Sequence, residues 1–152
     1  MIGKIRPRVL AGALIGLGLV GAAGLPGALA HKVKHTPEQL KLFESIFMEQ
    51  VRLGDLLFHG DEATAKAMGV TLSKTGMACA MCHPVGSDVH PYEFPKYQEQ
   101  MAKFATLRDM INWCIEKPNE GEKIDDDSPA MKALETYIYW SARGTKLDPG
   151  RH

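Results

Sequence analysis

The sequence lacks net charge and contains few cysteines. Its 18 basic and 18 acidic residues balance over 152 positions, and it has neither a basic block nor aromatic residues interleaved with basic ones. A nucleic-acid partner is therefore not expected. The three cysteines, Cys79, Cys82 and Cys114, cannot all pair within one chain, so at least one thiol needs another role. The length suits one modest domain.

The longest uncharged apolar stretch lies at the N-terminus. Three positive residues precede this stretch, and an Ala-x-Ala pattern ends it: Lys4, Arg6 and Arg8, then residues 9–24, then residues 28–30. This order is typical of a secretory signal peptide. We expect residues 1–30 to be cleaved after Ala30, leaving a soluble periplasmic domain over residues 31–152, whose 15 basic and 18 acidic residues give a formal charge of minus 3. An uncleaved membrane anchor is the alternative, because residues 9–30 nearly reach spanning length.

The pentapeptide Cys79-Ala80-Met81-Cys82-His83 carries the clearest chemical signal. Two thiols three positions apart can form thioether bonds to both vinyl groups of a haem, and the imidazole that follows can bind the iron from one side. The sequence therefore predicts covalently bound haem c, with Cys79 and Cys82 as attachment residues and His83 as an axial ligand. The pentapeptide occurs once, so one haem is expected.

Apolar residues recur at three- and four-residue steps in three segments, which predicts main helices over residues 37–58, 96–117 and 128–143. Their ends follow from local signals: a capping box at Thr36 and Gln39, a stop at Pro118, and Ser128 before Pro129. The expected inward-facing residues are Leu40, Phe43, Phe47, Val51, Gly54 and Phe58; Met101, Phe104, Leu107, Ile111, Cys114 and Ile115; and Met131, Leu134, Tyr137, Ile138 and Ser141. A short helix is expected near residues 62–68.

Gly54 interrupts the first apolar stripe, although glycine costs about 1 kcal/mol relative to alanine inside a helix. This suggests that another helix crosses there too closely for a side chain. Three helices around a haem, with Gly54 in the first and an aromatic-rich face in the last, resemble a class I cytochrome c domain. The resemblance implies an all-α fold with three main helices around one covalently attached haem, in which Gly54 packs against Tyr137 or Trp140.

The residues alone leave the second axial ligand of the iron open. Cys114 is the first candidate, because it is the unassigned thiol and lies on the inward stripe of the second predicted helix. Met110 precedes it by one helical turn, Met131 begins the last helix, and His90 lies in a proline-bounded loop. Each of these residue types has precedent as a haem ligand. Alternatively, Cys114 is a buried cysteine that acts as a small apolar residue.

A narrower resemblance covers roughly residues 75–142. The matching positions are residues 107–115, Pro118, Gly121, residues 127–131, Leu134 and Tyr137. They are similar to the haem domain of thiosulfate dehydrogenases and of the A subunit of the periplasmic sulfur-oxidising cytochrome complex, where the His/Cys haem is the site at which thiosulfate is conjugated or oxidised. The resemblance implies His83 and Cys114 as the two axial ligands. It also offers Arg108 as an anion-binding residue, with an ordinary surface arginine as the alternative.

A single haem passes one electron at a time. We therefore expect a periplasmic electron carrier, alone or as the electron-transfer subunit of an oxidoreductase, and we assign no catalytic residue. The alternative is the haem subunit of a thiosulfate-oxidising enzyme with a Cys-ligated catalytic haem. Coupling two thiosulfates releases two electrons, so this alternative needs a redox partner protein, such as a second haem protein. A ligand-sensing haem protein with a weak distal ligand is a third class.

Overall fold

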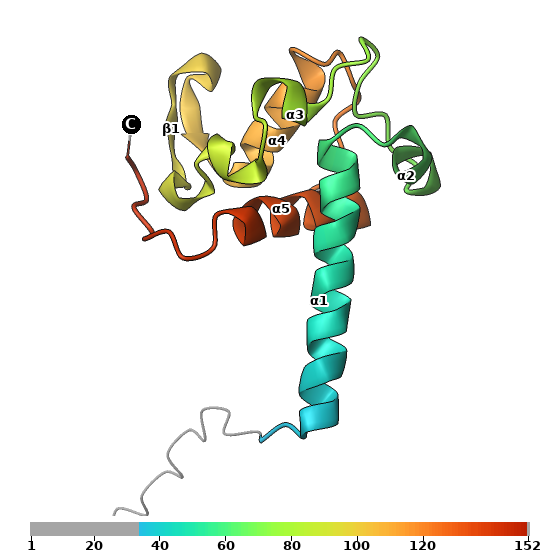
Figure 1. Ribbon diagram of the computed structural model, residues 1–152. Coiled ribbons are helices and arrows are strands. Elements are labelled where there is room, and N and C mark those ends of the chain that lie inside the picture. The colour runs from blue at the N-terminus through green and yellow to red at the C-terminus, as the bar shows by residue number, and fades with distance from the viewer. Residues whose placement is uncertain (1–33, 152) are drawn as a thin grey trace, which may run out of the picture. The chain divides into compact units, whose positions relative to one another are not determined.

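The computed structural model describes residues 34–151. Residues 1–30, for which a signal peptide is predicted, lie outside the described residues. Five helices and two short strands follow one another in Figure 1: α1 (Pro37–Phe58), α2 (Glu62–Ala67), α3 (Cys79–Cys82), β1 (Lys96–Gln98), β2 (Lys103–Ala105), α4 (Leu107–Glu116) and α5 (Pro129–Ser141). Short 3-10 turns occupy Gly86–Val89, Pro91–Glu93 and Glu99–Met101. Within residues 34–151, no helix is long and apolar enough to cross a membrane.

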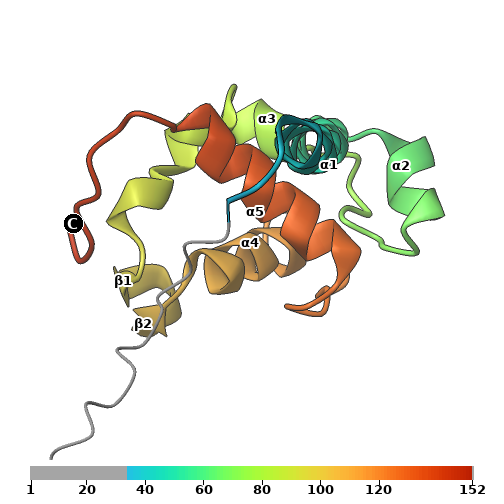
Figure 2. The ribbon, with the colours of Figure 1, turned by 90° about the horizontal axis from the view of Figure 1, so that it is seen from below.

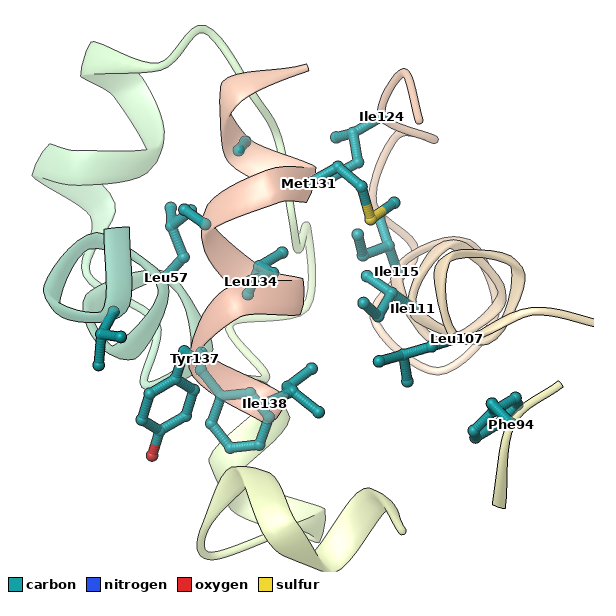
Figure 3. Packing of buried hydrophobic residues seen from close by; sticks show 14 residues of the cluster. Leu57, Phe94, Leu107, Ile111, Ile115, Ile124, Met131, Leu134, Tyr137 and Ile138 are labelled. Carbon is teal, nitrogen blue, oxygen red and sulfur yellow. The ribbon is translucent and has the colours of Figure 1, made fainter. Parts of the chain in front are cut away.

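The core is organised around α5, which packs against α1 on one side and α4 on the other (Figure 2). Figure 3 shows Leu134 of α5 between Leu57 of α1 and Ile111 of α4. Both long helices begin with the predicted caps. Thr36 accepts a hydrogen bond from the backbone N–H of Gln39, and the Ser128 hydroxyl accepts one from the N–H of Met131. These caps satisfy N–H groups that have no partner within the helix.

Gly54 lies where α1 crosses α5, which confirms the predicted close approach. A methyl group at this position would overlap the backbone carbonyl of Ala133 and would lie 2.7 Å from the Cβ of Tyr137. Tyr137 is therefore the predicted contact, together with Ala133, while Trp140 is not among the nearest neighbours. The absence of a side chain at Gly54 sets how deeply the C-terminal half of α1 sinks against α5.

The N-terminal half of α1 does not follow the prediction. Its apolar residues Leu40, Phe43 and Phe47 are exposed, whereas Val51, Gly54 and Phe58 farther along the same stripe are buried. The reason is geometric, because α5 crosses α1 near Gly54 and nothing among the described residues covers the first three turns. Figure 1 shows this half of α1 extending away from the other helices.

The predicted helix over residues 96–117 is also wrong in its first half. Residues 96–105 form an antiparallel hairpin in which Tyr97 lies opposite Phe104, and the turn places Ala102 in the left-handed region at φ 51°. Helix α4 begins only after Thr106, whose side chain accepts from the N–H of Asp109 while Asp109 accepts from the N–H of Thr106. This capping box starts the helix at Leu107, eleven residues later than predicted. Phe104 and Met101 consequently lie outside the core.

Two further expectations agree with the structure, although Ser141 and Cys114, which were also expected to face inward, are only half-buried. The short helix expected near residues 62–68 is α2, and the inward residues of α5, Met131, Leu134, Tyr137 and Ile138, are buried. Apart from the small hairpin, residues 34–151 form helices and loops. The predicted all-α architecture with three main helices, α1, α4 and α5, is confirmed.

Candidate haem site

The CxxCH pentapeptide forms a single helical turn, α3. The backbone N–H of His83 donates to the carbonyl of Cys79 at 2.9 Å, and that of Met81 donates to Ala78 at 3.0 Å. Residues three apart lie on the same side of a helix. The turn therefore presents Cys79 and Cys82 together, while the intervening Met81 is exposed.

One cavity of about 380 Å³ brings all four predicted site residues together. Cys79, Cys82 and His83 line it from α3, and Cys114 lines it from α4. Much of the apolar wall comes from α1, α4 and α5, through Phe58, Leu107, Ile111, Leu134 and Ile138, and Phe94 adds to it from the segment before β1. A deep, largely apolar cavity with a few convergent polar groups is the usual form of a cofactor site. The paired thiols, the adjacent imidazole and the apolar wall fit covalently attached haem.

Two of the three thiols of this cavity, Cys79 and Cys114, are partly shielded from water, whereas Cys82 is exposed. Burial is the main cause that raises the pKa of Cys79 to about 11, and the nearby thiols of Cys114 and Cys82 raise it further. Burial also raises the pKa of Cys114 to about 11, with a smaller contribution from Cys82. The three sulfur groups belong to residues that line the same cavity. Both Cys79 and Cys114 are therefore neutral thiols at neutral pH without a cofactor, and Cys114 must lose its proton to bind iron as a thiolate.

The other three candidates for the second ligand occupy different environments. Met110 and His90 line the cavity, whereas Met131 is fully buried in the core and does not line it. His90 adopts a left-handed backbone at φ 51° and stacks on Tyr92 with 5.7 Å between ring centroids. The cavity thus presents a thiol, a thioether and an imidazole in addition to His83.

A buried ion pair, which the sequence does not reveal, also lines the cavity. Lys96 Nζ donates to Glu93 Oε2 at 2.6 Å, and both side chains are largely buried. Burial alone would raise the pKa of Glu93, but the Lys96 hydrogen bond and the charges of Lys96, His90 and Arg151 outweigh it, so the pKa of Glu93 is lowered. The only sequence signal is the three-residue spacing of the two charges. Glu93 and Lys96 therefore place a fixed pair of opposite charges in the cavity wall.

Arg108, which the sequence offers as an anion-binding residue, is engaged elsewhere. Its guanidinium donates to Glu135 Oε2 at 2.8 and 3.1 Å and to the carbonyl of Asp126 at 2.9 Å. Arg108 does not line the haem cavity. These contacts join α4 to α5 and to the loop before it, which is the role of a structural surface arginine.

The fold and the site together define a c-type cytochrome domain. A family model for the SoxA/TsdA cytochrome c domain matches residues 65–147, which is more than half of the chain. The chain belongs to this family, and the predicted resemblance is confirmed. Membership establishes a haem-binding domain and supports a role in haem-based electron transfer.

Two curated relatives share part of the sequence. A thiosulfate dehydrogenase of Allochromatium vinosum is 29% identical over 84 residues, which cover 47% of this chain and 31% of that protein. A thiosulfate dehydrogenase of Psychrobacter arcticus is 29% identical over 70 residues, which cover 41% of this chain and 21% of that protein. The match thus spans less than a third of either relative's length.

A solved structure supports the fold. The thiosulfate dehydrogenase TsdBA from Marichromatium purpuratum, in its as-isolated form, superposes with a TM-score of 0.51 and 21% sequence identity. The superposition covers 77% of this chain and 26% of that one. At this identity the likeness concerns the fold alone.

Proposed function

We propose that this chain is a periplasmic monohaem cytochrome that transfers single electrons, alone or as the electron-transfer subunit of an oxidoreductase. The observation that carries the proposal is the shared cavity, where Cys114 faces the CxxCH turn. Family membership and the single CxxCH pentapeptide support it. The redox partner is another protein, such as a second haem protein.

Four residues would hold the cofactor. Cys79 and Cys82 would form the thioether bonds, and His83 and the thiolate of Cys114 would bind the iron. Bound haem would supply an iron that changes between the ferric and ferrous states. Since a thiolate carries negative charge, Cys114 would favour the ferric state and lower the reduction potential.

The rest of the cavity controls the surroundings of the iron. Phe58, Leu134 and Ile138 exclude water from the wall, which strengthens every charge interaction inside. The pair of Glu93 and Lys96 adds no net charge to the cavity wall, where the carboxylate of Asp88 adds to the negative charge that a Cys114 thiolate would carry. This arrangement suits a carrier of low potential.

Haem content and electron count test the proposal together. The purified protein is expected to contain one covalently bound haem per chain and to titrate in a spectroelectrochemical cell with the slope of a one-electron couple. A Cys79→Ala variant and a Cys82→Ala variant, which each lose one attachment thiol, serve as controls for attachment. Two haems per chain, or a two-electron slope, would contradict the proposal.

Export is tested separately. We propose cleavage after Ala30, so the mature protein should begin at His31 and appear in the periplasmic fraction of the cell. N-terminal sequencing and fractionation check this. A protein that keeps its N-terminus and stays in the membrane fraction would instead support the uncleaved anchor.

A second candidate function is the haem subunit of a thiosulfate-oxidising enzyme. The position of Cys114 in the cavity and the names of the two curated relatives favour it. Joining two thiosulfate ions through a sulfur–sulfur bond releases two electrons, of which one haem takes one, so a partner must accept the other. Thiosulfate-dependent haem reduction by the isolated chain would favour this function over simple electron carriage.

A further inference from the structure

Strand β1 contributes polar side chains to the wall of the haem cavity. Lys96 and Gln98 line the cavity from the strand, and Gln100 lines it from the 3-10 turn that follows. Successive side chains of a strand point to opposite faces, so Lys96 and Gln98 share one face and the half-exposed Tyr97 lies on the other. The hairpin thus turns a polar face towards a cavity whose other lining residues are mostly apolar.

Lys96 is the only lysine or arginine among the described residues that line this cavity, where Asp88 and Glu93 supply carboxylates. The Lys96 side chain is 14% exposed. A lysine buried to this extent costs free energy unless its ammonium group is paired with an anion and hydrogen-bonded. The partners of Lys96 Nζ therefore indicate what this part of the wall can bind.

The ammonium group of Lys96 has fewer partners than N–H donors. Lys96 Nζ donates to Glu93 Oε2 at 2.6 Å, and it lies 5.4 Å from the centroid of the Phe94 ring. Since an ammonium carries three donors, at least one of them has no partner among residues 34–151. Lys96 can therefore donate to a second anion while it keeps its contact with Glu93.

Bound haem would bring two carboxylates into this cavity. Its ring is apolar, and its two propionates leave the ring on the half opposite the two vinyl groups. Since Cys79 and Cys82 of α3 would fix the vinyl groups, the propionates belong on the side of the cavity away from α3. Figures 1 and 2 both show the hairpin of β1 and β2 apart from α3. The polar face of the hairpin is therefore the part of the wall that suits the propionates.

We propose that Lys96 binds a haem propionate, with the side-chain amide of Gln98 as a second donor. The proposal rests on the proposed function, because it needs haem attached through Cys79 and Cys82. Lys96 then pairs with two carboxylates, that of Glu93 and that of the propionate. Ferric haem carries one more positive charge than ferrous haem, so a cation beside it favours the ferrous state. Lys96 therefore raises the reduction potential above the value that the thiolate of Cys114 alone would set.

Two variants that differ only at Lys96 test the proposal. Glu93→Gln keeps the lysine, whereas Glu93→Gln with Lys96→Met removes it without leaving a buried carboxylate unpaired. Both are loaded with haem that carries ¹³C in its propionate carboxyl groups, and redox-induced infrared difference spectra record the labelled carboxylate band. We expect the band to lie at different frequencies in the two variants, because the double variant loses a charged hydrogen-bond donor to the propionate. The label keeps Asp88 and the other carboxylates of the protein out of this band.

Lys103→Met in the Glu93→Gln background is the matched control. Lys103 belongs to the same hairpin, but it pairs with Asp109 at 2.6 Å and does not line the haem cavity. Its loss should leave the band and the potential close to those of Glu93→Gln. Loss of Lys96 should favour the ferric state about threefold, which is about 30 mV at about 59 mV for a tenfold change. Circular dichroism and haem absorbance confirm that each variant is folded and loaded.

The wild-type protein provides a test that needs no variant. With ¹⁵N in its lysine side chains, solid-state magnetic resonance should detect a dipolar contact between a lysine Nζ and the labelled carboxyl carbon. Absence of this contact, or the same infrared band with and without Lys96, would overturn the proposal and leave Lys96 as the structural partner of Glu93. Either result would leave the proposed function intact if the same samples hold one covalent haem with a one-electron slope. A chain without covalent haem would overturn both.

Discussion

Replacing Gly54 with alanine should destabilise the protein by about 2–3 kcal/mol. The added methyl group would overlap the carbonyl of Ala133 and would lie 2.6 Å from its carbonyl carbon and 2.7 Å from the Cβ of Tyr137. These atoms belong to, or are attached directly to, the backbone of α5, so α1 and α5 must move apart. Overpacking of a core typically costs about 1–3 kcal/mol, and a rigid neighbour puts the cost at the upper end. The higher helix propensity of alanine returns at most about 1 kcal/mol.

Urea denaturation of the haem-loaded protein, followed by circular dichroism, measures this loss. With a slope of about 2 kcal/mol per molar urea, the midpoint should fall by about 1–1.5 M. Gly69→Ala is the matched control, because a methyl group there would meet no atom within 4 Å and only the φ of +67° opposes it. That conformation costs about 1 kcal/mol, or about 0.5 M. If Gly54→Ala lowers the midpoint no more than Gly69→Ala does, the proposed crossing of α1 and α5 is wrong.

Two further substitutions test charged groups. The carboxylate of Asp109 accepts hydrogen bonds from Lys103 and from the N–H and hydroxyl of Thr106, and these contacts lower its pKa from 3.8 to about 2. They therefore contribute their full stabilisation of the folded state above about pH 4, and this stabilisation is lost as the pH falls towards 2. Asp109→Asn should therefore lower the free energy of unfolding at neutral pH by about 1–2 kcal/mol, a modest amount because a third of the Asp109 side chain is exposed. The variant should also lose stability less steeply than the wild type between pH 4 and pH 2. Lys96→Met should cost about 3 kcal/mol and raise the pKa of Glu93, because a buried carboxylate loses its partner, whereas adding Glu93→Gln should restore most of the urea midpoint. No recovery in that double variant would argue against a buried pair, and unchanged acid unfolding in Asp109→Asn would argue against the Asp109 contacts.

Helices α1 and α5 were predictable because two independent signals coincide in each. The caps at Thr36 and Ser128 mark where the helices begin, and the apolar period marks which residues share a face. Gly54 added a third signal, since an unfavourable residue inside a stripe points to a close crossing. Periodicity does not state whether anything lies opposite a face, which is why the exposure of Phe43 and Phe47 could not be foreseen.

The sequence pattern places the start of α4 too early, because Met101 and Phe104 continue the three- and four-residue spacing of the apolar residues within α4. The capping box of Thr106 and Asp109 was present in the sequence and gives the correct start. Residues 96–105 pair across a turn at Ala102 instead, a non-local arrangement that a helical stripe does not exclude.

The haem site was partly predictable. The CxxCH pentapeptide identifies Cys79, Cys82 and His83 by their chemistry, and the stripe of α4 places Cys114 on an inward side. That Cys114 faces the same cavity as the pentapeptide follows only from the packing of α4 against α5. The buried pair of Glu93 and Lys96 was out of reach, because charged residues are rarely buried and a charge spacing alone usually indicates a solvated surface.

Ligation of the iron by Cys114 is tested most directly by low-temperature electron paramagnetic resonance and absorption spectroscopy of the ferric protein beside Cys114→Ala. The account predicts a low-spin signal of the thiolate type in the wild-type protein. That signal should be lost in the variant, while the haem stays covalently attached through Cys79 and Cys82. A signal unchanged by the substitution, together with a methionine-to-iron absorption band, would contradict the account. Cys114 would then be a core residue, and Met110, which also lines the cavity, would be the ligand to test.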